Sequence, residues 1–559
     1  MSTNAGAPQK RPTLKAVRGT RDLLPDQTPL WNFVEATARG VFARYGFGEI
    51  RTPILEDTSL FARAVGEETD IVGKEMFTWE DGERYSHQRL EAAWKAANAD
   101  SIYILEFESG LIGYVPDLKV HRFGKNRVEI VEFKNLATPE AIAKLASFVD
   151  AARLKDLQTD DKAPTIGRLV VPAGKSRLPK GIRLPDQVEL EEVAGDFFDS
   201  SQSLCLRPEN TAGVVRAYIE HKLGETGQLQ KLYYIGPQFR RERPQKGRYR
   251  QFWQIGAEVI GPQSSGSESA LRDAEVLQML AALLDELGIR GWKLDLNSVG
   301  SSEDRARYND ALRAALAPVK DQLCPDNQRR AETNPLRVLD SKDENDQAII
   351  EGLPKIADYL AEDSRVHFEQ VRAALDACGV KYNLNPRLVR GLDYYTRTTF
   401  EFTVTTGLGT QNALLGGGRY DGLSEMLGGP RAPGIGFAIG EDRLILTLQA
   451  QAEEDAKAEG AAQPAWAAKK LDAYIAPLGV AQNPAALALA HDLRSVGLSV
   501  EVGDGSFKLR KSFDVADSLA RNIILLGEDE VATQTATVKS FATGEQKKIA
   551  REELIGVLR

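Results

Sequence analysis

A short basic segment stands out in an acidic chain. Residues 239–252 (FRRERPQKGRYRQF) carry six Lys or Arg side chains and one carboxylate, that of Glu242, whereas the 559-residue chain has a formal net charge of −9. Arginine suits phosphate because its planar guanidinium forms two parallel, charge-assisted hydrogen bonds with phosphate oxygens. The segment therefore predicts a site for a phosphorylated ligand, although an isolated arginine is more often only a solvated surface charge.

The residues after this segment alternate in the way that a strand lining a pocket would. In FWQIGAE, Phe252, Gln254, Gly256 and Glu258 fall on one face of a strand. A ring, an amide and a carboxylate in a row provide a surface for stacking and acceptors for a cationic group. A solvated strand face with one exposed ring is the competing interpretation.

Other arginines are candidates for the same ligand. Arg240 and Glu242 share a face if the preceding strand continues through them, while Arg248 and Arg443 come from separate segments. Guanidinium groups from several segments can surround a triphosphate from different sides. We therefore expect the site to lie where these segments meet.

Patterns of apolar residues predict the elements that position these groups. We expect helices over 28–45, 211–223, 267–288 and 303–380, and strands over 47–57, 231–242, 250–261 and 398–404. The glycines of GGGRYDG (416–422) predict a turn. A charged, Ala-rich stretch at 451–470 predicts a linker, and the alternating strand and helix patterns of 471–559 predict a small α/β domain.

Several of these segments resemble known motifs. Residues 239–259 resemble motif 2 of a class II aminoacyl-tRNA synthetase, and GIGFAIGEDRL (434–444) resembles motif 3. Segments that resemble the histidyl-tRNA synthetase family specifically are LCLRPENTAG (204–213), NPLRVLDSK (334–342), RLVRGLDYYTRTTFEF (387–402) and GGGRYDGL (416–423). The resemblance implies an α+β class II catalytic core, in which an antiparallel sheet is flanked by helices, followed by an α/β anticodon-binding domain.

The resemblance also implies a two-step ligation. L-histidine would attack the α-phosphate of ATP, which Mg²⁺ would accompany, and the histidyl group would then pass to the 3′ end of histidine tRNA. The implied catalytic residues are Arg240, Arg390 and Arg443. The implied ATP-binding residues are Arg240, Glu242, Arg248, Phe252 and Arg443. The implied histidine-binding residues are Glu209, Asn210, Thr211, Arg240, Gln254, Glu258, Arg390, Tyr394 and Tyr395.

The same resemblance suggests how substrates are recognised. A neutral imidazole offers one N–H donor and one acceptor, which Glu258 and a tyrosine would complement. In the basic loop, Arg243, Lys246 and Arg250 are candidates for tRNA phosphates. The family is dimeric through the segment around 28–60, so we expect a homodimer.

Three positions depart from the family pattern. Asn210 stands where Gly is common, Trp253 where His is common, and Asp442 where Glu is usual. None of these changes removes a catalytic group. Asn210 lies beside the expected site for the histidine ammonium, so it is the departure most expected to affect histidine affinity.

An additional block interrupts the first part of the core. Residues 74–85 read as the first half of a hairpin whose return strand begins at Ser203, so residues 85–202 form an insertion at its tip. Within it, GYVPDLKVHRFGKNRVEIVEFKN resembles the PD-(D/E)xK nucleases, with two strands around a turn and then a helix. The candidate Mg²⁺ residues are Asp117, Glu132 and Lys134, with Glu91 as a further acid.

Other interpretations of the insertion stay open. Alternating charges on a hairpin commonly face water, and an active nuclease would threaten the tRNA substrate. A self-splicing intein fits poorly because the block lacks a penultimate His and a clear Thr-x-x-His. A tRNA- or partner-binding module without chemistry is the third interpretation.

Composition fits a cytoplasmic protein without a membrane span. No apolar run approaches about 20 residues, and the three cysteines have no metal-type spacing. We expect a flexible tail at 1–16, a catalytic core at 17–84 and 203–450, and a helical insertion within that core at 301–385.

Two rival functions remain. One is a catalytically silent synthetase paralogue that regulates the phosphoribosyltransferase of histidine biosynthesis. Such paralogues typically lack the anticodon domain and degrade the RGLDYY segment and the motif arginines, which this chain retains. The other is a synthetase fused to a nuclease-like or nucleic-acid-binding module with an added role.

Overall fold

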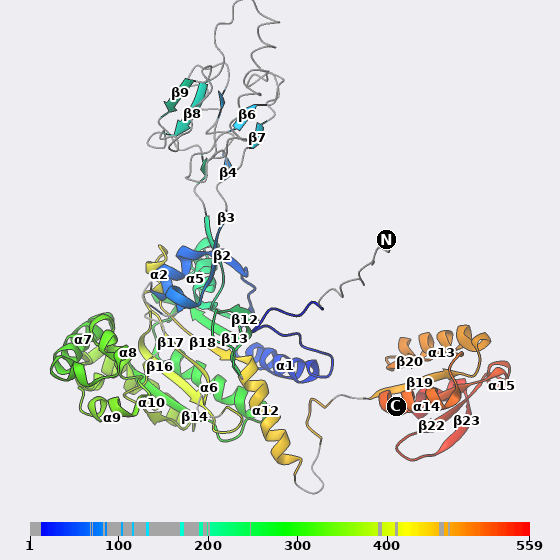
Figure 1. Cartoon of the computed structure of the whole chain (residues 1–559). Helices are drawn as coiled ribbons and strands as arrows, with labels where there is room; N and C mark the ends of the chain where they lie inside the picture. Colours follow the sequence, from blue (N-terminus) through cyan, green and yellow to red (C-terminus); the bar gives the residue numbers. More distant parts are fainter. Residues whose placement is uncertain are drawn as a thin grey trace, which may run out of the picture. The chain divides into compact units, whose positions relative to one another are not determined.

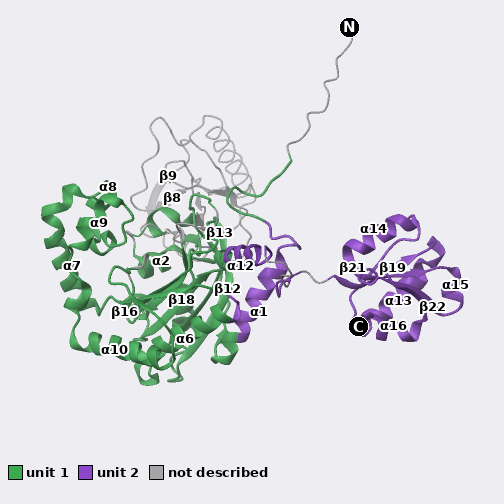
Figure 2. Ribbon diagram, turned by 90° about the horizontal axis from the view of Figure 1, so that it is seen from below, with its two compact units in different colours: residues 1–21, 41–285, 289–444 green, residues 22–40, 286–288, 445–559 purple. Residues whose placement is uncertain are grey.

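The computed structural model describes most of the chain outside the insertion. It describes residues 13–66, 69, 71–79, 203–245, 247–389, 394–408, 412–457, 463–467 and 470–559, and between 80 and 202 only the backbone of short strands. The chain divides into two compact units (Figure 2). Unit 1 comprises residues 1–21, 41–285 and 289–444, and unit 2 comprises residues 22–40, 286–288 and 445–559.

An eight-stranded sheet organises unit 1 (Figure 1). Its order is β1-β12-β13-β18-β17-β16-β14-β15, and neighbours are antiparallel except at its two edges, where β1·β12 and β14·β15 are parallel. The strands are β1 (Gly48–Glu49), β12 (Gln230–Phe239), β13 (Gln251–Ile260), β14 (Lys293–Ser298), β15 (Asn383–Leu384), β16 (Thr396–Thr403), β17 (Ala413–Arg419) and β18 (Gly434–Gly440). This mixed, mainly antiparallel sheet confirms the expected fold class.

Helices flank this sheet, as expected. The helices described between residues 28 and 455 are α1 (Thr28–Arg44), α2 (Thr58–Val65), α5 (Thr211–Glu220), α6 (Ala270–Glu286), α7 (Ser302–Leu316), α8 (Pro325–Thr333), α9 (Glu344–Glu351), α10 (Glu362–Ala377), α11 (Leu423–Met426) and α12 (Glu441–Asp455), and most of α1 and α12 belongs to unit 2. Helices α7 to α9 share a small hydrophobic core that includes Tyr308, Leu312 and Ile350. In the described part of the chain, no helix combines the length and the apolar character that a membrane crossing requires.

A three-stranded sheet lies where the insertion begins. Its order is β2-β11-β3, formed by β2 (Leu55–Asp57), β11 (Gln202–Leu206) and β3 (Phe77–Asp81). The antiparallel pairing of β3 with β11 confirms the predicted hairpin, and β4 (Arg84–Tyr85) pairs with β10 (Phe198–Asp199) beyond it. One face of this sheet contributes Cys205 to a buried cluster with α2 and α5.

Within the insertion the structure describes short strand pairs. β6 (Tyr114–Pro116) and β7 (Ile130–Glu132) are antiparallel, which confirms the predicted strand pair. β5 (Ile102–Tyr103), β8 (Arg168–Pro172) and β9 (Glu189–Val193) form a parallel sheet. The proposed metal-binding side chains lie outside the described residues, so the nuclease-like interpretation stays a prediction: Glu91, Asp117, Glu132 and Lys134.

The C-terminal part of unit 2 is an α/β domain. Its sheet order is β20-β19-β21-β22-β23, with parallel pairing of β19 to β20 and β21 and antiparallel pairing beyond β21. Its elements are β19 (Leu471–Pro477), α13 (Asn483–Ser495), β20 (Val500–Val502), α14 (Leu509–Leu519), β21 (Ala520–Leu526), α15 (Glu528–Ala532), β22 (Thr535–Ser540), β23 (Gln546–Ala550) and α16 (Leu554–Leu558). The predicted alternation is confirmed.

The structure corrects four local expectations. The strand expected over 47–57 is broken into β1 and β2 around Pro53, because proline lacks an N–H and restricts the residue before it. The glycines expected to form a turn at 416–418 lie inside β17, where a Cβ on Gly417 would meet the carbonyl oxygen of Gly436 at 2.1 Å. These glycines allow neighbouring strands to approach closely, and they do not form a turn. Strand β14 was not expected, and α12 continues to Asp455 into the stretch read as a linker.

Candidate active site

A cavity of about 240 Å³ opens on one face of the large sheet. On the opposite face, Lys231 of β12 forms a 2.9 Å salt bridge with Glu275 of α6. Phe252 and Gln254 of β13 line the cavity, as their alternation predicts. Its polar and aromatic lining residues are Glu209, Thr211, Arg240, Glu242, Arg248, Tyr249, Phe252, Gln254, Tyr394, Tyr395, Glu401, Phe437, Asp442 and Arg443.

Small residues form the floor of this cavity. Gln254 pairs with Gly440, Gly256 with Ala438, and Ala438 with Gly416 across three neighbouring strands. Residues that oppose one another in antiparallel strands lie on the same face. Beside Gln254, Gly416, Ala438 and Gly440 line the cavity and leave room above the sheet for a ligand, whereas the Tyr234 ring covers Gly256.

Residues near the start and the end of the loop that follows β12 form the basic end of the cavity. Glu242 lies between two arginines, with its Oε2 3.2 Å from Nη1 of Arg248 and its Oε1 3.9 Å from Nη1 of Arg240. The Arg240 guanidinium lies 5.2 Å from the centroid of the Phe252 ring. Strand β12 ends at Phe239, so the loop rather than the expected strand positions Arg240 and Glu242.

Arg443 closes this end from the start of α12. Its Nη1 donates a hydrogen bond to the carbonyl oxygen of Ala413. Burial lowers the pKa of the Arg443 guanidinium, and the positive charge of Arg248 lowers it further, whereas Glu242 and Glu401 act in the opposite direction. Burial is the largest of these effects, because it disfavours the charged form of the guanidinium.

The other end of the cavity presents a buried carboxylate. Glu209 accepts hydrogen bonds from the backbone N–H groups of Thr211, at 2.7 Å, and of Ala212, at 3.0 Å, at the start of α5. Burial raises the pKa of Glu209, while these N–H groups and Arg240 partly offset that rise. Glu209 is therefore placed to accept from a cationic group, and Arg240 lies between the two ends.

Glu258 lies behind this end rather than in the cavity wall. Its side chain is fully buried and accepts hydrogen bonds from the hydroxyls of Thr211, at 2.8 Å, and Tyr420, at 2.7 Å. Burial raises the pKa of Glu258 to about 8. Because the Thr211 hydroxyl donates this hydrogen bond, its oxygen keeps the capacity to accept one. Tyr394 and Tyr395 complete this wall, with ring centroids 4.8 Å apart.

The three departures from the family pattern do not change the cavity wall equally. The Asn210 side chain does not line the cavity: its Oδ1 accepts from Thr52 Oγ1 at 2.5 Å and from Arg207 Nη1 at 3.3 Å. Trp253 is also absent from the lining, as its position on the other strand face predicts. Asp442 does line the cavity, and its Oδ2 accepts from the backbone N–H of Trp253 at 3.0 Å.

The remaining predicted residues fall into two groups. Arg390 and Lys246 lie outside the described residues. Arg243 is exposed and Arg250 is half-buried, and neither lines the cavity. Their assignment to tRNA phosphates therefore stays a prediction.

Sequence reasoning missed Glu401 and Tyr249, which both line the cavity. A signal for Glu401 was present, because Phe400 and Phe402 on either side of it are fully buried and alternation puts Glu401 on the opposite face. Tyr249 carried no such signal, since it lies in an irregular loop.

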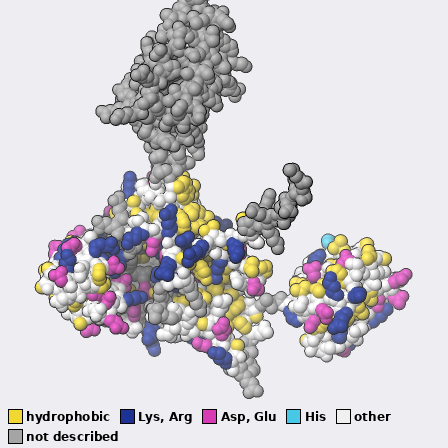
Figure 3. Space-filling model, in the orientation of Figure 1, with side chains coloured by type: hydrophobic (Ala, Val, Ile, Leu, Met, Phe, Trp, Pro, Cys, Tyr) yellow, Lys and Arg dark blue, Asp and Glu magenta, His cyan; other side chains and the backbone are white. Residues whose placement is uncertain are grey.

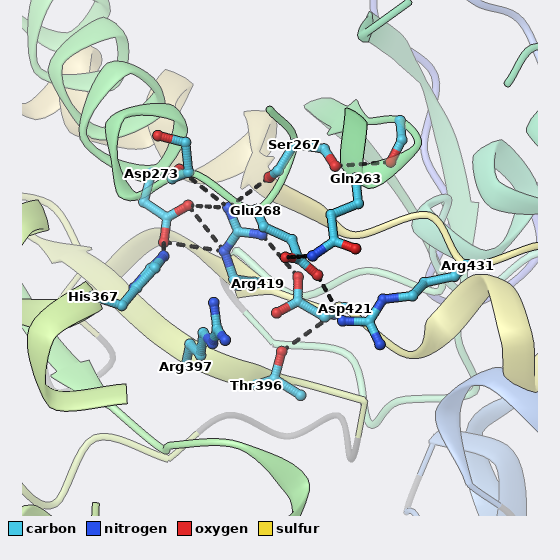
Figure 4. A network of polar contacts seen from close by, with 12 residues as sticks. Gln263, Ser267, Glu268, Asp273, His367, Thr396, Arg397, Arg419, Asp421 and Arg431 are labelled. Atoms are coloured by element: carbon cyan, nitrogen blue, oxygen red, sulfur yellow. Dashed lines mark hydrogen bonds and ion pairs between the residues drawn. The ribbon is translucent and has the colours of Figure 1, made fainter. Parts of the chain in front are cut away.

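A buried ionic network surrounds Arg419 (Figure 4). Arg419 of β17 is fully buried and pairs with Asp273 of α6 at 2.6 Å and with Asp421 at 2.8 Å. The backbone N–H of Asp421 donates to Thr396 Oγ1 at 3.2 Å. Thr396 begins β16 directly after the two tyrosines, so the network fixes the end of the strand next to them.

Family models match both parts of the chain. Residues 193–444 match the model described as "Histidyl-tRNA synthetase", and residues 472–559 match the model described as "Anticodon binding domain".

Full-length relatives match over nearly the whole chain. A "Histidine--tRNA ligase" of Koribacter versatilis is 51% identical over 98% of this chain and 96% of its own length. Proteins of the same name from Solibacter usitatus and Synechococcus elongatus are 42% and 37% identical, each over 97% of this chain and over 98% and 94% of their own lengths.

Solved structures match as well. The crystal structure of apo histidyl-tRNA synthetase from S. aureus gives a TM-score of 0.63 at 29% identity and covers 98% of this chain and all of its own. A histidyl-tRNA synthetase from Nostoc, at 16% identity and a TM-score of 0.54, covers 98% of this chain and 99% of its own and shares the fold.

Proposed function

The chain belongs to the histidyl-tRNA synthetase family, and on this basis we propose that it is a histidine–tRNA ligase whose unit 1 cavity activates L-histidine. In the first step a carboxylate oxygen of histidine attacks the α-phosphorus of ATP. The bond to the β-phosphate bridging oxygen breaks, so histidyl-adenylate forms and pyrophosphate leaves. In the second step a hydroxyl of the 3′-terminal ribose of histidine tRNA attacks the histidyl carbonyl, and AMP leaves.

The observation that carries this proposal is the arrangement of charge within one cavity. Arg240, Arg248 and Arg443 come from the two sides of one loop and from α12, yet all three line the same space. A triphosphate carries the negative charge that three guanidinium groups in one space can pair with. Arginines placed before the reaction stabilise the charge that develops as pyrophosphate leaves.

The opposite end of the cavity is suited to the amino acid. Glu209 and the lone pairs of Thr211 provide acceptors for an α-ammonium group. Arg240 lies between this end and the basic end, which places it at the junction of the histidine carboxylate and the α-phosphate. We propose Arg390 as a second catalytic arginine on the grounds of the sequence resemblance alone.

The side chains of the same wall are proposed to select the imidazole group. Tyr394, Tyr395 and Gln254 line it, and Glu258 sets the direction of the Thr211 hydroxyl. A buried site with several polar groups rejects a side chain that leaves those groups unpaired, by about 10⁴-fold or more. Phe252 and Glu242 are proposed to hold the adenine ring and its amine.

Magnesium is proposed to enter with ATP. Mg²⁺ takes oxygen ligands and usually keeps several waters, so phosphate oxygens would provide most of its contacts. Glu401 supplies carboxylate oxygens of the right donor type in the cavity wall. The ion would neutralise phosphate charge, while the arginines orient the nucleotide.

The tRNA is proposed to meet both units. Lys and Arg side chains gather on one face of unit 1 (Figure 3). The exposed side chain of Arg243, in the loop beside the cavity, is suited to the phosphates of the acceptor end. The C-terminal α/β domain of unit 2 matches an anticodon-binding model, and we propose that it reads unstacked anticodon bases.

We also propose a cytoplasmic homodimer. The outer face of the three-stranded sheet exposes Leu55 at 46% and Trp79 at 42%, beside Ile54 at 42%. Neighbouring apolar side chains exposed to this degree are typical of an association surface. Sedimentation equilibrium on the parent and on Trp79→Glu tests this point, since a dimeric parent and a weakened variant are expected.

Histidine-dependent exchange of pyrophosphate into ATP tests the central proposal. The full chain and a variant with 85–202 replaced by a short turn should both exchange, and the full chain should charge histidine tRNA. A chain that binds ATP yet exchanges nothing would instead fit the silent paralogue. Incubating tRNA with Mg²⁺ and the full chain, with Glu132→Ala as a control, tests the nuclease-like interpretation of the insertion.

A further inference from the structure

A segment before the first helix crosses the basic loop. The carbonyl oxygen of Gly19 accepts a 2.7 Å hydrogen bond from the backbone N–H of Arg250. Gly19 has φ +91°, and a Cβ there would meet Cγ of Arg250 at 2.8 Å and Cγ of Pro244 at 2.9 Å. The positive φ and the side-chain atoms packed against this position both favour glycine. The crossing is therefore a specific contact with both sides of the loop.

Arg21 extends this contact to the start of α12. Its Nη2 lies 2.7 Å from Oδ1 of Asp442, and its Nη1 donates to the hydroxyl of Tyr249 at 3.2 Å. The guanidinium carbon lies 4.3 Å from the centroid of the Tyr249 ring, within the range of a cation–π contact. The other oxygen of Asp442 accepts from the backbone N–H of Trp253. One guanidinium thus joins two segments of the cavity wall, and Asp442 links them to β13.

The two residues that Arg21 contacts are adjacent in the sequence to two arginines that are proposed to bind the triphosphate. Tyr249 directly follows Arg248, and Asp442 directly precedes Arg443. The side chain of Asp442 is only 5% exposed, whereas that of Arg21 is 35% exposed. A carboxylate buried to this extent needs a charged or hydrogen-bonding partner, and removing one destabilises its local arrangement.

We propose that Arg21 is a positioning residue for the nucleotide: by holding Tyr249 and Asp442 together, it sets the spacing between the Arg248 and Arg443 guanidinium groups. Arg21 does not line the cavity, so we assign it no direct contact with the substrate. The inference rests on the proposed function for the identity of the nucleotide. Its effect is on ATP, because the histidine end of the cavity is built from other segments.

Steady-state exchange kinetics of Arg21→Ala test this role. The KM for ATP should rise by about tenfold or more, as expected for losing a charge-assisted contact, while the KM for histidine changes less than about twofold. Arg21→Lys should recover part of the loss, since an ammonium can pair with Asp442 but cannot reproduce the planar contact with Tyr249. The matched control is Arg431→Ala, which removes a 2.6 Å salt bridge to Glu268 outside the cavity and should leave both KM values unchanged.

A double-mutant cycle and a binding measurement separate positioning from general loss of structure. In an Asp442→Asn background, Arg21→Ala should cost clearly less than in the parent, because the ion pair is already removed. Calorimetric titration with α,β-methylene-ATP should show the same loss of affinity in Arg21→Ala without any reaction. A parent without histidine-dependent exchange would refute the proposed function while this titration still tested Arg21. Equal affinity of parent and Arg21→Ala for the analogue, with an unchanged KM for ATP, would overturn the inference.

Discussion

Two arginines of unit 1, the fully buried Arg419 and the half-buried Arg443, have opposite electrostatic surroundings. Arg419 has Asp273 and Asp421 within hydrogen-bonding distance, and although burial alone would lower its pKa, these carboxylates raise it. The pKa of Arg443 is lowered instead, by burial and then by Arg248. The comparison indicates that carboxylates within hydrogen-bonding distance outweigh the effect of burial at Arg419, whereas the effect of burial prevails at Arg443.

The largest effect expected from this comparison is on folding. Arg419→Leu leaves the buried Asp273 and the half-buried Asp421 without their cation, and breaking a buried ion pair costs about 3–5 kcal/mol. Urea denaturation followed by tryptophan fluorescence should show this loss in the transition of unit 1. Arg431→Ala, an exposed pair, should change stability by less than about 1 kcal/mol. An Arg419 variant as stable as the parent would remove the contrast between the two arginines.

Substitution in the cavity should affect activity instead. Arg443→Ala and Arg240→Ala should each lower the rate of histidine-dependent pyrophosphate exchange by about 100-fold or more, because each removes a fixed donor from the developing charge. Their urea midpoints should stay close to that of the parent. Exchange at the parental rate in either variant would exclude that arginine from the reaction.

The pH dependence of stability distinguishes a buried acid from both arginines. The pKa of Glu258 is raised from 4.5 to about 8, so the folded state keeps a proton that the unfolded state loses between these values. The folded state therefore binds more protons in this window, and the contribution of Glu258 to stability falls as pH rises from about 4.5 to 8. Thermal melts of the parent and Glu258→Gln should show the variant gaining relative stability from pH 5 to 8. A constant difference would contradict a raised pKa.

The smallest effect is expected at the exposed loop. Arg243→Ala should weaken tRNA binding about equally for different tRNA sequences and reduce the slope of log affinity against log salt by about one. Filter binding between 50 and 200 mM salt measures this, and ATP affinity should not change. Salt dependence identical to that of the parent would remove Arg243 from the tRNA contacts.

Alternation along strands is the part of the site that the sequence predicts well. Phe252 and Gln254 line the cavity and Trp253 does not, because side chains of a strand alternate strictly. Beyond the end of the strand, side chains no longer alternate between two faces. Arg240 and Glu242 do line the cavity, but they reach it from an irregular loop. The glycines at 416–418 show the converse problem, since a glycine needed for close packing has the same letter as one needed for a turn.

By itself, the sequence determined which side-chain types recur at motif spacing, which strand faces they occupy, and where an α/β domain follows the core. The tertiary structure alone decided which charges are neutralised. The carboxylate that pairs with Arg419 comes from Asp273, 146 positions away, and Glu258 meets Thr211 from 47 positions away. Local periodicity reaches only a few residues along the chain, whereas an ion pair depends on distance in space, so the folded arrangement determines whether an arginine stabilises the fold or binds a ligand.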